Sequence, residues 1–174
     1  MTTNTYRVWI KATPQQVWDA IVDAAINGQY GYGIPATYDL RAGGAYEVKN
    51  PAEMVAQGFP AQMITGEVLS VDAPKKLVQT WLPNFGPETV AEGPRALTHE
   101  ISEELNGLVV LTVTIDVTGA PTVEQITSGQ DERAGGGFPM LLSDLKTFLE
   151  TGAAWGPTRM AAAMEQGAKD NRSR

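Results

Sequence analysis

Hydrophobic and polar positions alternate at the beginning of the chain. Over residues 5–12 every second residue is apolar, and these residues share one face. This period of two, with β-branched and aromatic residues, predicts a strand. The spacing changes at Thr13, which suits the N-cap of a helix, while Pro14 suits its first turn and Gln16 completes a capping box. The predicted helix buries an apolar stripe that consists of Val17, Trp18, Ile21, Val22 and Ala25.

The middle of the chain contains short strand patterns that are separated by turns and not by long helices. Residues 26–36 are rich in glycine and aromatic residues and predict a short helical turn followed by a loop. Asn106-Gly107 is the strongest short hairpin signal in the sequence. We expect six strands in this part, over residues 37–40, 45–49, 62–71, 76–82, 95–105 and 108–117.

A long helical pattern occupies the region near the C-terminus. It runs from about Phe138 to Glu150 after three glycines, and Thr151-Gly152 supplies a C-cap. Its apolar stripe is formed by Leu141, Leu142, Leu145, Phe148 and Leu149. We interpret residues 1–152 as one domain and residues 153–174 as a C-terminal extension that is helical around 157–166 or frayed, with the last eight residues disordered.

This order of elements predicts an α+β fold. Runs of strands between flanking helices are typical of α+β proteins and not of alternating α/β proteins. An antiparallel sheet with one polar face needs a cover on its other face, and the helix at 138–150 is the only predicted element long enough to provide it. We therefore expect a curved antiparallel sheet of six or seven strands around a long C-terminal helix, closed at one end by the helix after the first strand.

Two segments of this pattern resemble a known protein family. Residues 5–20, with the segment from Ala12 to Trp18 at their core, are similar to the opening strand and helix of the START/Bet v 1-like (SRPBCC) superfamily. Residues 136–152 are similar to the last helix of one branch, the C-terminal domain of the activator of Hsp90 ATPase homologue 1-like proteins. This chain has Phe138 where that branch often has Trp. The resemblance covers most of the chain and implies the helix-grip fold.

The resemblance also carries expectations about function. Members of the superfamily mostly bind apolar small molecules between the sheet and the helix, and a minority are cyclases, aromatases or hydrolases. The Hsp90 branch implies a chaperone partner and a role in the stress response. That implication is weaker than the fold, because the chain has only the domain that resembles the C-terminal half of the activator. A homodimer is left open.

Composition and charge exclude several classes of function. Thirteen Lys and Arg against twenty Asp and Glu give a net charge of −7, and such a surface repels phosphate backbones, so no nucleic-acid partner is expected. The absence of cysteine and the presence of one histidine exclude Cys-based and His-rich metal sites, so no metal or cofactor is expected. No apolar run approaches the ~20 residues of a membrane helix, and the first five residues give no secretion signal. We therefore expect no membrane contact and a cytoplasmic location.

His99 is the first candidate functional residue. Within its predicted strand it shares one parity with Leu97, Ile101 and Leu105, so its side chain is expected to point inward. A neutral imidazole that is buried without a partner costs ~2–7 kcal/mol, so His99 needs a hydrogen-bond partner, a water or a ligand. It is interpreted either as a satisfied interior histidine or as a ligand contact or general base at an internal cavity.

Further candidates surround the same predicted cavity. Trp81 and Gln79 share one parity of their strand, where the amide acts as a polar anchor unless it lies at a wet sheet edge. Tyr30 and Tyr32, together with Tyr38, border the glycine-rich stretch, where they either form the rim of the cavity or pack as ordinary loop residues. The opposite wall is expected to consist of Phe138, Met140 and Leu141, which otherwise are plain core residues.

Other signals argue against a defined reaction. The glycines at 135–137 follow no strand and precede no Lys-Ser or Lys-Thr pair, so they do not form a phosphate-binding loop. The carboxylates form no pair placed for acid–base work, and Ser102 and Ser143 lack a His–acid partner set. The sequence therefore favours a protein that binds a small hydrophobic molecule over an enzyme. The two alternatives are a cyclase- or hydrolase-like enzyme that uses His99 at the cavity and an Hsp90-type chaperone-associated stress-response module.

Overall fold

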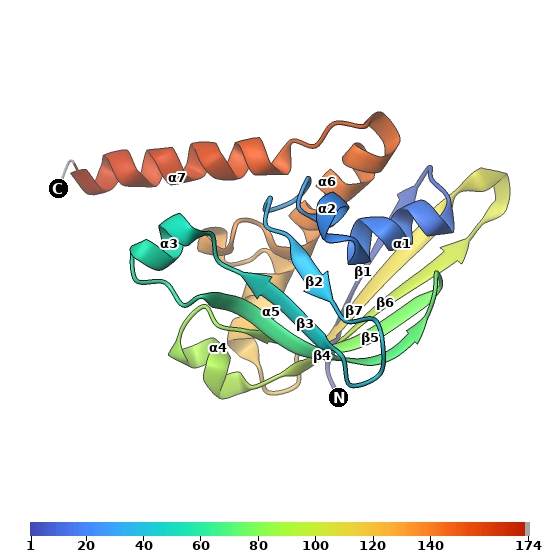
Figure 1. Cartoon of the computed structure of the whole chain (residues 1–174), viewed down its shortest axis with the longest axis horizontal. Coiled ribbons are helices and arrows are strands. Elements are labelled where there is room, and N and C mark those ends of the chain that lie inside the picture. The colour runs from blue at the N-terminus through green and yellow to red at the C-terminus, as the bar shows by residue number, and fades with distance from the viewer. Residues whose placement is uncertain (173–174) are drawn as a thin grey trace.

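A curved antiparallel sheet of seven strands forms the frame of the protein (Figure 1). The computed structural model describes residues 1–172 of the chain. The strands are β1 (Thr3–Ile10), β2 (Ala36–Tyr38), β3 (Ala45–Lys49), β4 (Gln62–Asp72), β5 (Lys76–Pro83), β6 (Arg95–Glu103) and β7 (Val109–Asp116). The helices are α1 (Pro14–Val22), α2 (Ala24–Asn27), α3 (Ala52–Ala56), α4 (Pro87–Glu92), α5 (Pro121–Ser128), α6 (Gly137–Thr151) and α7 (Gly156–Arg172), with short 3₁₀ turns at Leu105–Gly107 and Glu132–Ala134.

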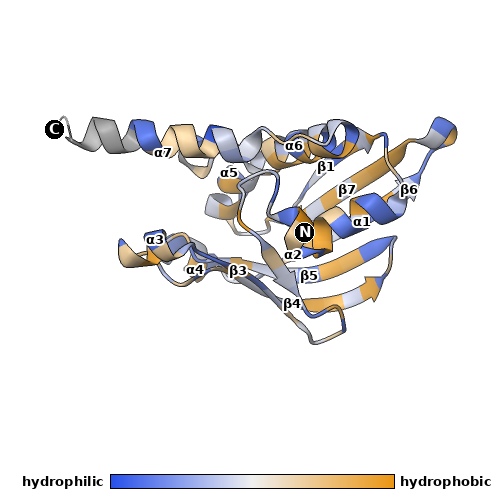
Figure 2. Ribbon diagram, turned by 45° about the horizontal axis from the view of Figure 1, so that its top comes forward, coloured by the Kyte–Doolittle hydropathy of each residue, from blue (hydrophilic) through white to orange (hydrophobic). Residues whose placement is uncertain are grey.

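The connection between the first two strands crosses the whole sheet. The strands lie in the order β1-β7-β6-β5-β4-β3-β2, so β1 and β2 form opposite edges, and α1 and α2 span the distance between them. The sheet bends around these two helices (Figure 2), and α6 packs along β1 and meets α1. This arrangement confirms the predicted α+β, helix-grip fold with a long C-terminal helix and a helix after the first strand.

Gly66 and two irregularities in strand pairing bend the sheet. The register shifts once between β3 and β4 and once between β4 and β5, and such bulges increase the local twist. A Cβ atom at Gly66 would collide with the carbonyl oxygen of Thr80 and press on the ring of Tyr46. Glycine therefore lets β4 approach β5 closely and lets the Tyr46 ring lie across β4.

One face of the sheet, called the inner face from here on, is turned toward α1 and α6 and carries the core. Figure 2 shows hydrophobic residues along β5, β6 and β7, and alternate residues of these strands are buried. The predicted inward parity of Leu97, His99 and Ile101 is confirmed. The prediction for Leu105 is wrong, because β6 ends at Glu103 and Leu105 is 87% exposed in the turn that follows.

The local signals at the ends of elements form as predicted. The backbone N–H of Gln16 donates to Thr13 Oγ1 at 3.2 Å, and the N–H of Thr13 donates to Gln16 Oε1 at 2.9 Å, which completes the capping box of α1. Asn106 and Gly107 both have positive φ angles, 69° and 71°, as a type I′ hairpin turn requires. The N–H of Gly152 donates to the carbonyl of Phe148 at the end of α6.

Several short helices were not predicted from the sequence. Helices α3, α4 and α5 lie in segments for which we predicted no helix, and each has only five to eight residues. Helix α7 starts one residue before the predicted helix and continues to Arg172, beyond the predicted end at residue 166. Residues 173 and 174, part of the tail predicted to be disordered, lie outside the described residues. Among residues 1–172, no helix combines the length and the apolar character needed to cross a membrane.

Asp144 fastens the start of α7 to the rest of the molecule. Its side chain is completely buried in α6 and accepts three backbone hydrogen bonds, from Gly31 at 2.7 Å, Trp155 at 2.7 Å and Gly156 at 2.9 Å. Hydrogen bonds to a carboxylate are stronger than those between neutral groups. One side chain therefore holds the loop after α2, the helix α6 and the link to α7 together.

Candidate functional site

Two polar side chains lie in the middle of the inner face. Gln79 on β5 is 0% exposed and His99 on β6 is 9% exposed. Gln79 pairs with Leu97 and His99 pairs with Leu77, so the two polar residues are diagonal neighbours on adjacent strands, typically about 7–8 Å apart. The direct neighbours of both are apolar, so the two polar groups have no counterpart in the strand pairs that surround them.

Four polar atoms on the inner face have no hydrogen-bond partner. They are Oε1 and Nε2 of Gln79, Nδ1 of His99 and the hydroxyl of Tyr6. Tyr6 belongs to the same row as His99, because both pair with Val113 from opposite sides. A buried polar group without a partner costs about 1–3 kcal/mol. The inner face thus combines apolar walls with unmet hydrogen-bonding capacity.

Tyr38 and Tyr46 extend this polar region toward the edge of the sheet. They form a direct pair between β2 and β3, with ring centroids 4.8 Å apart. Burial raises the pKa of Tyr38 well above its usual value, and also raises the pKa of Tyr46, so both remain neutral phenols. Gln79 lies close enough to affect both pKa values, although no contact meets the geometry of a hydrogen bond.

The inner face is electrically neutral at its centre. Burial lowers the pKa of His99 from 6.5 to about 4, because desolvation disfavours the charged imidazolium. The imidazole is therefore uncharged at neutral pH. Among the residues whose burial is described, no lysine or arginine is buried, and the one buried carboxylate is Asp144. Asp144 accepts its three hydrogen bonds from the loop after α2 and from the start of α7, and its charge does not contribute to the shift of the His99 pKa.

Trp81 and Phe138 border the polar atoms. Trp81 is buried on the same face of β5 as Gln79, and its ring meets Phe85 edge-on at a centroid distance of 6.3 Å. Phe138, at the start of α6, is buried with its ring centroid 5.4 Å from that of Tyr6. Both side chains therefore lie beside the unpartnered groups of the inner face.

Met140 and Leu141 occupy different surroundings. Met140 is buried and packs beside Gly136, and the half-buried Leu141 contacts Gly31. Both contacts lie at the junction of α6 with the glycine-rich loops. Whether either residue touches a ligand stays a prediction.

The hydroxyls of Tyr30 and Tyr32 are engaged by the backbone. Tyr30 donates to the carbonyl of Ala20 at 2.8 Å, and its ring stacks on Phe148. Tyr32 donates to the carbonyl of Ala134 at 2.8 Å and accepts from the N–H of Gly137 at 3.1 Å. Both tyrosines brace loops against α1 and α6 in this structure, and their predicted role as a cavity rim stays a prediction.

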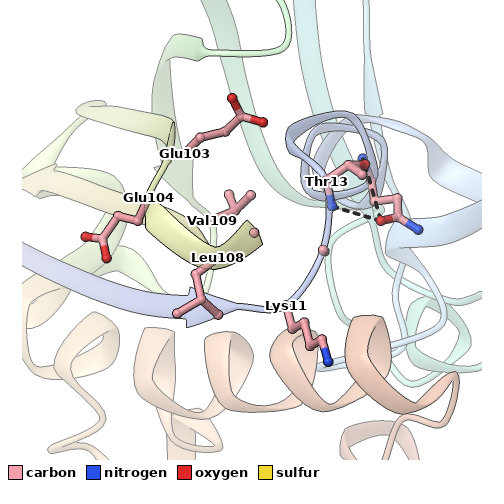
Figure 3. A pocket seen from close by; sticks show the side chains of 9 residues that line it. Lys11, Thr13, Glu103, Glu104, Leu108 and Val109 are labelled. Carbon is pink, nitrogen blue, oxygen red and sulfur yellow. Dashed lines mark hydrogen bonds between the residues drawn. The ribbon is translucent and has the colours of Figure 1, made fainter.

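A first pocket, of about 480 Å³, lies between the start of α1 and the β6–β7 hairpin (Figure 3). Its polar groups are largely committed. Thr13 and Gln16 form the capping box, and the N–H of Lys11 donates to Glu150 at 2.8 Å. Figure 3 shows that the side chains of Glu103, Glu104 and Lys11 diverge, so they form neither an acid–base pair nor an ion-binding group.

A second pocket, of about 250 Å³, lies at the other end of the sheet beside α3 and α4. It is lined by Asn50, Met54, Phe59, Pro60, Met63, Asn84, Phe85 and Gly86. Met63 packs against the core, and Phe85 contacts Trp81, so the apolar lining continues toward the inner face. None of the eight residues predicted for the ligand site lines either pocket.

Sequence reasoning missed two residues of this region and one buried carboxylate elsewhere in the fold. Tyr6 and Tyr46 follow the alternation of their strands and could have been placed inward, but the lack of a partner for the Tyr6 hydroxyl has no signal in the sequence. Asp144 had a signal, because a carboxylate within the apolar stripe of a helix indicates a buried partner. No group of three or more His, Asp or Glu side chains that could hold a metal ion occurs in the part of the chain that the structure describes.

Comparisons with known proteins give the same architecture. The sequence model of the Activator of Hsp90 ATPase homolog 1-like protein family matches residues 11–150. CalU16 from Micromonospora echinospora is similar with a TM-score of 0.60 and 19% identity, over 92% of this chain and 82% of that chain. An HSP90 activator from Plasmodium falciparum is similar with a TM-score of 0.60 and 17% identity, over 86% of this chain and 96% of that chain.

Protein MLL2253 from Mesorhizobium loti is similar with a TM-score of 0.62 and 14% identity, over 85% of this chain and 96% of that chain. No curated protein matches the chain. At identities this low, the likeness to the three solved structures shows the fold alone.

Proposed function

Because the chain belongs to the Activator of Hsp90 ATPase homolog 1-like protein family, we propose that it binds a small, largely apolar molecule between the inner face of the sheet and α6. The observation that carries this proposal is the set of unpartnered polar atoms on Gln79, His99 and Tyr6 within an apolar core. Ligand sites are typically apolar pockets with a few polar groups that fix orientation. A ligand supplies the partners that the protein does not.

We propose that the ligand enters this site from the surface at the second pocket. Phe59 and Phe85 are about half exposed there, at 50% and 47%, and Trp81 links Phe85 to the inner face. Aromatic and methionine side chains adapt to ligands of irregular shape. The route and the polar atoms together support entry between α3 and α4.

Nile red, a neutral dye whose fluorescence increases in apolar surroundings, tests the proposal. We expect saturable binding by the native protein and loss of binding in Val113→Phe, because Val113 lies between Tyr6 and His99 on the inner face. Thr112→Phe is the matched control, since the neighbouring Thr112 points to the other face of the same strand. Native mass spectrometry of freshly purified protein would show any compound that co-purifies.

Circular dichroism and thermal melting establish that each variant is folded. Overpacking a core typically costs 1–3 kcal/mol, so Val113→Leu replaces Val113→Phe if the larger side chain prevents folding. Equal dye binding by the native protein and by a folded inner-face variant would place the dye on the surface and overturn the proposal.

An enzyme that uses His99 as its general base is a weaker candidate. A general base works best when its pKa is near the operating pH, and the pKa of His99 is about 4. The structure gives His99 no carboxylate partner that would raise this value. A hydrolase or cyclase reaction would have to show turnover that His99→Leu abolishes while dye binding is retained.

A chaperone-associated role in the stress response is a separate candidate, favoured by the family match. It predicts that the protein binds an Hsp90-type chaperone and changes the rate of its ATP hydrolysis. Chaperone binding through the surface of the protein would persist in Val113→Phe, whereas chaperone binding that depends on the inner site would be lost. Sedimentation analysis of the same samples would show whether the chain forms a homodimer.

A further inference from the structure

The unpartnered atoms of the inner face specify both hydrogen-bond donors and acceptors. The amide of Gln79 offers N–H donors at Nε2 and an acceptor at Oε1, and a phenol such as Tyr6 can act as either. None of these atoms has a protein partner. A pure hydrocarbon would leave all of them unpartnered. A molecule that only accepts hydrogen bonds would leave Oε1 of Gln79 without a donor.

The same region provides no charge to balance a charged ligand. His99 is neutral at pH 7 because burial lowers its pKa to about 4, and the buried phenols are un-ionised. No buried lysine or arginine is described near them, and the carboxylate of Asp144 is used by three backbone N–H groups. Burying an unpaired carboxylate or ammonium group is strongly unfavourable.

The unpartnered atoms are spread across neighbouring strands, so they fit a ligand with a polar edge and not one with a single polar atom. Gln79 and His99 are diagonal neighbours on β5 and β6, and Tyr6 lies two strands beyond His99 in the same row. Adjacent strands are about 4.8 Å apart, so a ligand of modest size can reach the amide of Gln79 and the imidazole of His99 together. The surrounding side chains, such as Trp81 and Phe138, then contact its apolar body.

We propose that the ligand of this site is a neutral molecule with an apolar body and one polar edge that both donates and accepts hydrogen bonds, as a carboxamide or a phenol does, and that it is not a fatty acid or another carboxylate. This inference rests on the proposed function and narrows it. Gln79 is the specificity-determining residue, because it alone supplies a donor and an acceptor from one fully buried side chain.

Three probes with the same aromatic body test the inference: naphthalene, 2-naphthamide and 2-naphthoate. We expect the native protein to bind 2-naphthamide at least tenfold more tightly than naphthalene at pH 7, as one or two net hydrogen bonds would give, and to bind 2-naphthoate most weakly. Dissociation constants are measured from the quenching of tryptophan fluorescence and by calorimetry. In Gln79→Leu the preference for the amide over naphthalene should fall to near one, with naphthalene binding retained.

Thr80→Val is the matched control on the opposite face of the same strand, and it should keep the preference for the amide. Equal binding of the three probes would mean that ordered water already satisfies Gln79, and it would overturn the inference while the proposed function stands. Tightest binding of 2-naphthoate, or no binding of the amide by a protein that binds Nile red, overturns it as well. If no probe binds and Nile red binding is insensitive to Val113→Phe, the proposed function itself fails.

Discussion

Asp144 and the pair Gln79 and His99 are buried in the same molecule, but their polar atoms are in opposite situations. The carboxylate of Asp144 accepts three backbone hydrogen bonds. The amide of Gln79 and Nδ1 of His99 neither donate nor accept a hydrogen bond. Asp144 and Gln79 are 0% exposed and His99 is 9% exposed, so burial alone does not show whether a polar side chain has a hydrogen-bond partner.

The difference lies in what surrounds each group. Asp144 is placed where the backbone of the loop after α2 and the start of α7 run close to α6, and these segments present free N–H groups. Gln79 and His99 are placed within a sheet whose backbone groups are already paired. A polar side chain on the inner face can therefore find a partner only in another side chain, a water or a ligand.

The largest effect is expected for Asp144. Asp144→Leu leaves three backbone N–H groups, two of them buried, without an acceptor and should lower the free energy of unfolding by about 3–5 kcal/mol, as the loss of one member of a buried polar set does. Urea denaturation followed by circular dichroism measures this change. Asp144→Asn keeps the shape and one acceptor oxygen, so its loss should be smaller.

A melting temperature of Asp144→Leu close to that of the native protein would contradict the view that this carboxylate holds α6, α7 and the loop together. Dye binding by Asp144→Asn provides a further contrast. The amide variant should keep its binding of Nile red, because Asp144 fastens segments and does not border the unpartnered atoms.

An intermediate effect is expected from the protonation of His99. Burial lowers its pKa from 6.5 to about 4, so between these values the unfolded chain binds a proton that the folded protein does not. The contribution to stability is complete above pH 6.5 and is lost as the pH falls toward 4. The loss should reach about 2 kcal/mol at pH 5 and about 3 kcal/mol near pH 4.

His99→Leu separates this contribution from that of the carboxylates. Hydrogen bonds and nearby charges lower the pKa of Glu150 and Asp116, and these groups also destabilise the fold in acid, but at lower pH. The difference in unfolding free energy between the native protein and His99→Leu should therefore change mainly between pH 6.5 and pH 4. A difference that is constant over this range would show that His99 is not buried as described.

Much of the fold could be predicted because strong local signals agree with each other. The alternation in β1, the capping box of Thr13 and Gln16, and the Asn106-Gly107 turn each act within a few residues. Helices α3, α4 and α5 were not predicted because each is too short to show an apolar stripe. Leu105 was misplaced because alternation predicts direction only as far as the strand continues.

For the candidate site, the sequence pattern predicts which way a side chain points but not which hydrogen-bond partner it has. Parity placed His99 on the inner face, as the structure confirms, and the structure shows that Gln79, for which a wet sheet edge was left open, lies there too. Their missing partners depend on which residues pair across the strands, and the engaged hydroxyls of Tyr30 and Tyr32 depend on carbonyls of Ala20 and Ala134. Such contacts join segments that a sequence pattern does not bring together.

The smallest effect is expected for Gln79, and it has the opposite sign. Gln79→Leu replaces an unpartnered buried amide by an apolar side chain of similar size, so it should raise the free energy of unfolding of the ligand-free protein by about 1 kcal/mol. This corresponds to an increase of about 2–4 °C in melting temperature for a chain of this length. Gln62→Leu is the control, because the exposed Gln62 donates to Glu47 at 2.9 Å and should give no gain. A loss of stability in Gln79→Leu would mean that an ordered water already bonds the amide, in which case Gln79 would resemble Asp144 and the contrast between the two regions would disappear.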